Sequence, residues 1–143
     1  MRWKTLKLES AFDRYTFALQ KSAIQGHGVF TLDRLPSRKK IGEITGRLVR
    51  LPQARREIQN AKRIYLVELT DRWAVDCSRG SALGHINHSC APNCYVRIIG
   101  MRVEMYTLRE VPAGSELTID YGETPHVRGM KCACKAEACR GHV

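Results

Sequence analysis

Apolar and polar residues alternate over short stretches of the chain, and glycine, proline or polar turns separate these stretches. Residues 15–19 alternate in this way, and Gly26-His27-Gly28 leads into the β-prone residues 29–31. Alternation with a period of two is typical of a strand with one buried face. The two segments therefore predict a strand, a turn and a second strand.

The next region predicts interrupted strands followed by a helix. Residues 41–51 are rich in β-branched side chains, but Gly42 and Gly46 interrupt them. Pro52 stands where a helix can begin, because the N–H groups of the first helical turn have no acceptor within the helix, and proline has no N–H. Residues 53–61 follow as the predicted surface helix, the one helix that the pattern favours.

The second half of the chain predicts strands and tight turns. Residues 65–69 and 73–76 predict two strands joined by a polar turn, and residues 95–99 and 101–108 predict a hairpin across a glycine. A Pro-Ala-Gly turn then precedes a strand over residues 116–121. Many short strands with few short helices predict a mostly β fold.

Length and hydropathy restrict the class of protein. A chain of 143 residues fits one domain. No apolar run approaches the ~20 residues that span a bilayer, and the charged N-terminal residues do not form a secretory signal. We expect an intracellular protein in a reducing compartment, with no membrane span.

Charge is unevenly distributed within a net charge of +10. Residues 34–63 contain ten Lys or Arg against Glu43 and Glu57, a balance of +8, whereas residues 104–123 have a balance of −4. The first stretch predicts weak contact with nucleic acid, and the second predicts attraction of a basic substrate. The alternative for each stretch is a solvated surface without a partner.

The six cysteines indicate a metal site. Three of them, Cys132, Cys134 and Cys139, crowd the C-terminus. Residues two apart rarely reach disulfide geometry with each other, whereas thiolates on a tight loop converge on tetrahedral zinc. A closed structural site needs a fourth ligand, and the spacing leaves several candidates open: Cys77, Cys90, Cys94 and His142.

Residues 87–93 form the densest polar cluster of the chain. His88 beside Cys90 suggests a thiol nucleophile with its base, but a metal-ligand role suits Cys90 better. Asn87-His88-Ser89 matches a glycosylation sequon, although nothing else indicates secretion. The glycines at 26 and 28 lack the third glycine and the following helix of a dinucleotide fingerprint, so alone they predict only a turn.

In this order the motifs resemble the SET-domain family of protein lysine methyltransferases, over about residues 17–141. The chain is identified as a small stand-alone member. Residues 22–31 resemble the first cofactor-binding segment of the family, and residues 84–93 resemble its asparagine-histidine-serine-cysteine signature. Residues 114–122 are similar to its catalytic-tyrosine signature, and residues 132–141 to its post-SET cysteine motif.

The resemblance implies a β-clip fold of the SET type, in which several short curved sheets and a pseudoknot-like threading place the last two signatures side by side. It implies an N-terminal extension over residues 1–14, a SET domain over residues 15–123 and a post-SET zinc-binding tail over residues 124–143. Residues 1–14 or a homodimer partner would cover the surface that a cysteine-rich module covers in many relatives.

The resemblance also implies the cofactors and their ligands. S-adenosylmethionine would be held around Gly26, His27 and Gly28, by Asn87 and His88, and partly by the tail. The substrate lysine would enter from the opposite face through a narrow channel. A structural zinc would bind Cys90, Cys132, Cys134 and Cys139.

Methyl transfer requires a neutral amine, whereas free lysine has a pKa of about 10.4. Burial beside a positive sulfonium lowers that pKa, so no strong base is needed. Tyr121 is the predicted catalytic tyrosine, which orients the amine and holds the methyl by weak C–H···O contacts. Tyr65 is a second channel hydroxyl, or alternatively an aromatic core residue.

Ile119 lies two residues before the predicted catalytic tyrosine. Phe or Tyr is common here in the family, and an aliphatic side chain would leave an apolar space in which a methylated amine can turn. Ile119 therefore predicts di- or trimethylation. The alternative is that Ile119 packs in the core and that Tyr95 or Val96 forms the channel wall.

The combined reading is an S-adenosylmethionine-dependent lysine N-methyltransferase acting on a basic protein, of which a histone is one candidate. Its location is undecided between chromatin and a microbial cytoplasm. Gly84 and His85 replace the usual arginine-phenylalanine pair, which favours the alternative of a catalytically weak, zinc-containing module that binds nucleic acid or a protein. A zinc hydrolase is excluded, because all-thiolate sites leave no open coordination position.

Overall fold

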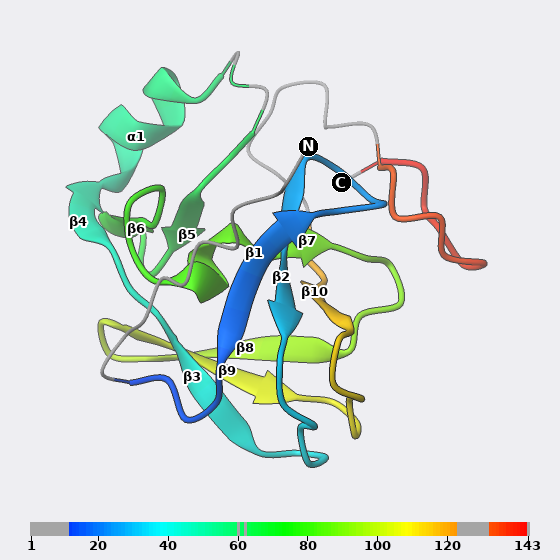
Figure 1. The fold of residues 1–143 in the computed structure, drawn as a ribbon. Coiled ribbons are helices and arrows are strands. Elements are labelled where there is room, and N and C mark those ends of the chain that lie inside the picture. Colours follow the sequence, from blue (N-terminus) through cyan, green and yellow to red (C-terminus); the bar gives the residue numbers. More distant parts are fainter. Residues whose placement is uncertain (1–11, 60, 62, 123–131, 143) are drawn as a thin grey trace.

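A computed structural model describes residues 12–59, 61, 63–122 and 132–142. Three small sheets surround one core, and a single α-helix lies at one side of the described part of the chain (Figure 1). The mostly β fold is confirmed. Most of the expected N-terminal extension, the beginning of the tail, Lys62 and Glu123 lie outside the described residues.

The first sheet holds both signature segments. Its order is β1 (Phe17–Lys21), β2 (His27–Thr31), β10 (Glu116–Ile119) and β7 (Asn87–His88). Strands β7 and β10 pair in parallel, with Thr118 opposite Asn87 and Ile119 opposite His88. The side-by-side arrangement of the two signatures, which the resemblance implied, is therefore confirmed.

The second sheet has the order β3 (Lys40–Ile44), β9 (Arg102–Thr107) and β8 (Cys94–Ile99). Strands β8 and β9 form the expected hairpin. Gly46 separates β3 from the next strand as expected, but Gly42 lies inside β3, at a register irregularity. A glycine at a bulge is compatible with a continuing strand.

The third sheet has the order β4 (Arg47–Arg50), β6 (Trp73–Asp76) and β5 (Leu66–Glu68), and it adjoins the helix α1 (Leu51–Glu57). The helix begins two residues earlier than expected, because Leu51 and Ala54 are its buried residues and Pro52 stands in its first turn. A short 3₁₀ helix, η1 (Ala82–His85), was not predicted.

The core lies between the sheets and η1. Its largest fully buried side chains include Leu35, Ile41, Leu83, Met105 and Leu117, which come from segments far apart in the sequence. Among the described residues, no helix has the length and apolar character needed to cross a bilayer.

Candidate functional site

The parallel pair of β7 and β10 positions the residues around Tyr121. The Tyr121 backbone N–H donates to Nδ1 of His88 at 2.9 Å, and the Tyr121 hydroxyl donates to the carbonyl of Ile86. Although 40% of the Tyr121 surface is exposed, its ring end lies against η1 and β7. Burial raises the pKa of the phenol, so the hydroxyl stays protonated and serves as a hydrogen-bond donor.

A cavity of about 320 Å³ opens beside this tyrosine. Tyr65 and Tyr121 both line it, together with an aliphatic wall formed by Ile44, Val96, Ile98 and Ile119. The volume falls within the usual range for a site that binds a small molecule, about 300–1,000 Å³. An apolar wall in the same cavity as two phenols suits the desolvation of an amine.

The structure bears on the two readings of Ile119. Ile119 is 8% exposed and belongs to the core, yet it also lines the cavity, so packing in the core is compatible with the predicted channel role. Val96 lines the cavity with it. Tyr95 does not, because its ring stacks on Tyr106 at a centroid distance of 5.5 Å.

The Tyr65 ring lines the cavity and packs against the core. Its centroid lies 5.0 Å from that of His85. Within the part of the chain that the structure describes, the Tyr65 hydroxyl makes no hydrogen bond, so it can accept one from or donate one to a ligand. Both readings of Tyr65, a channel hydroxyl and an aromatic core residue, fit this position.

The loop before β2 is held in shape by Ser22 and Glu116. Ser22 Oγ accepts hydrogen bonds from the N–H groups of Ile24 and Gln25 and donates to the Glu116 carboxylate at 2.7 Å. Gly28 lies directly under that carboxylate, since a Cβ there would come within 2.0 Å of Glu116 Oε1. Any side chain at 28 would therefore push Glu116 away.

Asn87 joins this loop to β7. Its Nδ2 donates to the carbonyls of Gln25 and His27 at 3.1 and 3.3 Å and to Glu116 Oε1 at 2.9 Å. Asn87 and Gln25 line the cavity, whereas Gly26, His27 and Gly28 are not among its lining residues. The predicted cofactor segments thus meet, and Asn87 is the side chain among them that faces the cavity.

His88 connects Tyr121 to the cysteine cluster. Because Nδ1 accepts the Tyr121 N–H, the proton of the neutral ring must be on Nε2, which lies 3.2 Å from Cys90 Sγ. Burial lowers the pKa of His88, in agreement with a neutral ring. Both ring nitrogens are occupied, so any cofactor contact by His88 would involve its backbone.

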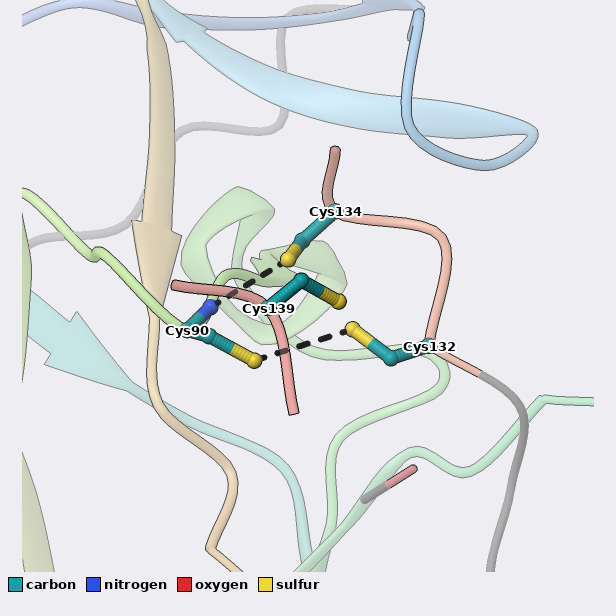
Figure 2. A group of neighbouring side chains, drawn as sticks. All are labelled: Cys90, Cys132, Cys134 and Cys139. Carbon is teal, nitrogen blue, oxygen red and sulfur yellow. Dashed lines mark hydrogen bonds between the residues drawn. The ribbon is translucent and has the colours of Figure 1, made fainter. Parts of the chain in front are cut away.

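Four cysteine side chains converge beside the end of β7 (Figure 2). The sulfur atoms of Cys90, Cys132, Cys134 and Cys139 all lie within 4.8 Å of one another, and those of Cys90 and Cys132 are 3.9 Å apart. Tetrahedral zinc with Zn–S bonds of about 2.3 Å requires sulfurs about 3.8 Å apart. The donor set therefore fits a closed tetrahedral metal site, and Cys77 and Cys94 lie outside it.

Backbone groups prepare this cluster for a cation. The N–H groups of Cys90 and Ala136 point at the Cys134 sulfur and lower the pKa of its thiol to about 6. The tail also reaches the end of β10, because Arg140 forms a bidentate pair with Asp120 at 2.7 and 2.8 Å. This pair lowers the pKa of Asp120 to about 2.

The departures at Gly84 and His85 have a local explanation. A Cβ at Gly84 would lie 2.8 Å from Cys77 Cβ and 3.0 Å from the Cys77 carbonyl oxygen, so Cys77 occupies the space of the missing side chain. Cys77 is buried and its thiol donates to the carbonyls of Tyr65 and Gly84. Nε2 of His85 is buried without a partner among the described residues.

The sequence analysis does not predict the contacts that Glu116, Cys77 and Arg63 make in the structure. Glu116 lies inside the catalytic-tyrosine signature, so the motif could have pointed to it as a site residue. Cys77 was considered only as a metal ligand, and Arg63 was counted only within the basic stretch. Their roles depend on contacts with residues far away in the sequence.

Comparison with known proteins agrees with this geometry. The SET domain family matches residues 26–122, which is more than half of the chain. The histone-lysine N-methyltransferase trithorax of Drosophila virilis is 29% identical over all of this chain, and the histone H3-lysine(4) N-trimethyltransferase ATX1 of Arabidopsis thaliana is 33% identical over 91% of it.

A histone-lysine N-methyltransferase of Saccharomyces cerevisiae, specific for H3 lysine 4, is 32% identical over 86% of the chain. The chain spans only a small part of these relatives, namely 4% of the trithorax protein and 13% of each of the other two. The likeness therefore concerns one domain of much longer proteins.

Proposed function

This chain belongs to the SET-domain family, and from that premise we propose that it is a protein-lysine N-methyltransferase that uses S-adenosylmethionine. The observation that carries the proposal is the position of Tyr121. Its protonated hydroxyl is held at the Ile86 carbonyl, on a cavity that Tyr65 and Asn87 also line. The two phenols, the backbone carbonyl and the apolar wall can orient one amine.

The residues around the cavity fit S-adenosylmethionine, which supplies an electrophilic methyl group on a sulfonium. The polar side chains of Gln25 and Asn87 line the cavity, and the volume of about 320 Å³ admits a small molecule. The aliphatic wall excludes water from the reacting amine. That exclusion favours the neutral amine, and Tyr121 and Tyr65 fix its direction.

We propose structural zinc for the cysteine cluster. Four thiolates complete a tetrahedral coordination sphere, so the metal would stabilise the tail and would not take part in the chemistry. His88 orients Cys90, and Arg140 links the tail to Asp120. The metal site would therefore hold the tail beside the cavity.

The proposed substrate is a lysine in a basic protein tail, and a histone is the first candidate because the relatives named above are histone methyltransferases. Action on a histone would place the protein at chromatin, whereas a basic protein of a microbial cytoplasm would be the alternative. We also propose that di- or trimethyl-lysine is formed, because Ile119 forms part of the aliphatic wall.

The proposal is tested by incubating the zinc-loaded protein with methyl-labelled S-adenosylmethionine and, separately, histones, nucleosomes and a lysate. Mass spectrometry of the labelled proteins identifies the substrate, the lysine and the number of methyl groups. We expect labelled lysine in a basic protein. Tight cofactor binding with no labelled product in any mixture would contradict the enzyme and favour the binding module.

A further inference from the structure

Arg63 extends a guanidinium group into the cavity from the chain segment before β5. Its Nη2 donates to the His27 carbonyl at 3.1 Å and to Asn87 Oδ1 at 3.2 Å. Its Cζ lies 5.4 Å from the centre of the Tyr65 ring, and Nη1 lies 2.7 Å from the position of a Cβ on Gly26. The group therefore contacts the glycine loop, β7 and the channel tyrosine together.

No acidic side chain of the cavity neutralises Arg63. Two carboxylates line the cavity, but Glu68 pairs with Arg55 at 2.7 Å and Asp120 pairs with Arg140 at 2.7 Å. Among the described residues, Arg63 is the one cation lining the cavity, and it takes part in no ion pair. Burial is the largest cause that lowers the pKa of His85, and the positive charge of Arg63 is the second.

The pattern of contacts leaves hydrogen-bond donors for a ligand. Both hydrogen bonds come from Nη2, so the N–H groups of Nε and Nη1 are available within the described part of the chain. Because Nη2 is already bonded, no two-pronged fork remains, but Nε and Nη1 can each donate a single charge-assisted hydrogen bond to a carboxylate oxygen. A half-buried cation with unused donors, fixed by neutral acceptors, is arranged to receive an anion.

We propose that Arg63 binds the carboxylate of the aminoacyl group of S-adenosylmethionine. The inference rests on the proposed function, and it assigns a cofactor-binding residue that the sequence motifs do not contain. S-adenosylmethionine carries one carboxylate, while its ammonium and sulfonium are positive and would be repelled by a guanidinium. Of its charged groups, the carboxylate is thus the one that suits Arg63.

The test compares S-adenosylmethionine with decarboxylated S-adenosylmethionine, which keeps the adenosine, the sulfonium and the ammonium but lacks the carboxylate. Affinities of both ligands are measured by calorimetry on the zinc-loaded chain. For Arg63→Met we expect affinity for S-adenosylmethionine to fall about 10- to 100-fold, because a charged hydrogen-bonded pair is lost. Affinity for the decarboxylated ligand should hardly change or should rise.

Two further variants complete the comparison. Arg63→Lys should restore part of the preference for the carboxylate-bearing ligand, since lysine keeps the charge and can donate a hydrogen bond but lacks the planar guanidinium. Arg50→Met is the matched control, because Arg50 is exposed and lies over the Trp73 ring, 5.1 Å from its centre, and does not line the cavity. It should leave both affinities unchanged.

The outcomes separate the possible failures. If Arg63→Met or Arg63→Lys weakens both ligands equally, Arg63 only bridges His27 and Asn87, and the inference is wrong while the proposed function stands. If the unmodified protein binds neither ligand, the proposed function itself fails, and the inference fails with it. Thermal melting without ligand shows which variants are folded.

Discussion

At the scale of single residues, the proposed chemistry depends most on the hydroxyl of Tyr121. Its hydrogen bond to the Ile86 carbonyl holds the ring, and the hydrogen bond from the Tyr121 N–H to His88 holds the backbone. Removing the hydroxyl leaves the backbone bond in place. In the proposed mechanism, the phenol would act where the amine reacts, away from the contacts that hold the 22–28 loop.

For Tyr121→Phe we expect loss of methyl transfer by about 100-fold or more, because misplacing the reacting groups has effects of this size. S-adenosylmethionine binding should stay within a few-fold, and unfolding free energy should fall by about 1 kcal/mol for the lost hydrogen bond. Single-turnover kinetics and calorimetry on the same sample measure both. A parallel loss of binding and transfer would instead assign Tyr121 a structural role.

Ile119 determines the shape of the aliphatic wall. In Ile119→Tyr, the added ring and hydroxyl would occupy the space in which a methylated amine must turn, so we expect the unmodified protein to pass beyond monomethyl-lysine and the variant to stop early. Mass spectrometry under excess cofactor counts the methyl groups. Val96→Ala, which enlarges the same wall, is the matched comparison and should not reduce the number. An unmodified protein that stops at one methyl would refute the proposal.

Some residue roles could be predicted from the sequence and others could not. Cys90 was assigned from a motif, and the four sulfur atoms do meet. Glu116 holds the loop through Ser22, 94 residues away, and Arg63 reaches Asn87 across 24 residues. Such contacts depend on which strands become neighbours, and a local pattern does not contain that information.

At the scale of elements, the described part of the tail, residues 132–142, is joined to the segments that follow β7 and β10. The Arg140–Asp120 pair reaches the end of β10, and the cysteines add the Cys90 N–H to Cys134 Sγ contact at 3.5 Å. Cys134 is the one buried side chain of residues 132–142, so in the proposed metal site zinc would order this segment. The position of the tail beside the cavity would then depend on zinc.

We expect about one zinc per chain, and we expect Cys90→Ser to lose most of it, because a closed site needs all four thiolates. Chelation should weaken S-adenosylmethionine binding as the tail is released. Elemental analysis measures the metal, and calorimetry measures the binding. Cys94→Ser is the control, since Cys94 is buried in β8 outside the cluster. Full zinc retention by Cys90→Ser would disprove the link between tail and signature loop.

The second sheet carries a buried charge network on β3 and β9. Lys40 Nζ donates to Glu43 and Glu104 at 2.8 and 2.7 Å, and Arg102 also pairs with Glu104. Lys40, followed by Arg102 and Tyr106, lowers the pKa of Glu104 to about 2 against an ordinary value of 4.5. Because the folded pKa is the lower one, the ionised carboxylate stabilises the fold above pH 4.5, and this contribution is lost as pH falls toward 2.

Glu104→Gln should therefore lower the melting temperature at pH 7, and the difference from the unmodified protein should shrink between pH 4.5 and pH 2. Thermal melts followed by circular dichroism across this range test it. Glu110→Gln is the control, because Glu110 is exposed and its pair with Arg34 is open to solvent. A constant difference at all pH values would mean that packing, and not ionisation, is lost.

The sequence predicted the types of the secondary-structure elements better than it predicted their first and last residues. The hairpin of β8 and β9 and the pair of β5 and β6 were correct, since each is local and has a clear turn. The first strand was expected at residues 15–19 but runs over Phe17–Lys21, because its register is set by pairing with β2. The short η1 was missed, since four residues carry no periodic signal.

At the scale of the whole molecule, ion pairing reduces the asymmetry of charge that the sequence suggested. In residues 34–63, four of the cations pair with carboxylates: Arg34, Lys40, Arg47 and Arg55. The described carboxylates of residues 104–120 are also engaged, by Arg34, Lys40, Arg140 or the Ser22–Asn87 bonds. The four described carboxylates of the acidic stretch therefore already have partners within the protein, and attraction of a basic substrate by this stretch stays a prediction.

The same pairing sets the expected strength of nucleic-acid binding. Arg63 lines the cavity and Lys62 lies outside the described residues. Four exposed cations of the stretch have no acidic partner among the residues that the structure describes: Arg38, Lys39, Arg50 and Arg56. For a single strand, the logarithm of affinity falls with the logarithm of salt by about 0.7 for each phosphate contacted. Four contacts predict a slope of about −3, and all ten cations of the stretch would predict about −7.

We therefore expect weak binding of a labelled single-stranded oligonucleotide, with a slope near −3 by fluorescence anisotropy between about 50 and 200 mM salt. The variant Arg38→Gln with Lys39→Gln should reduce the slope by about 1 to 2, because two phosphate contacts are removed. Arg55→Gln should leave it unchanged, because Arg55 is already bound to Glu68 by two hydrogen bonds. A slope near zero would show that the basic stretch is only a solvated surface, whereas a slope near −7 would show that the arginines leave their carboxylates to bind phosphate.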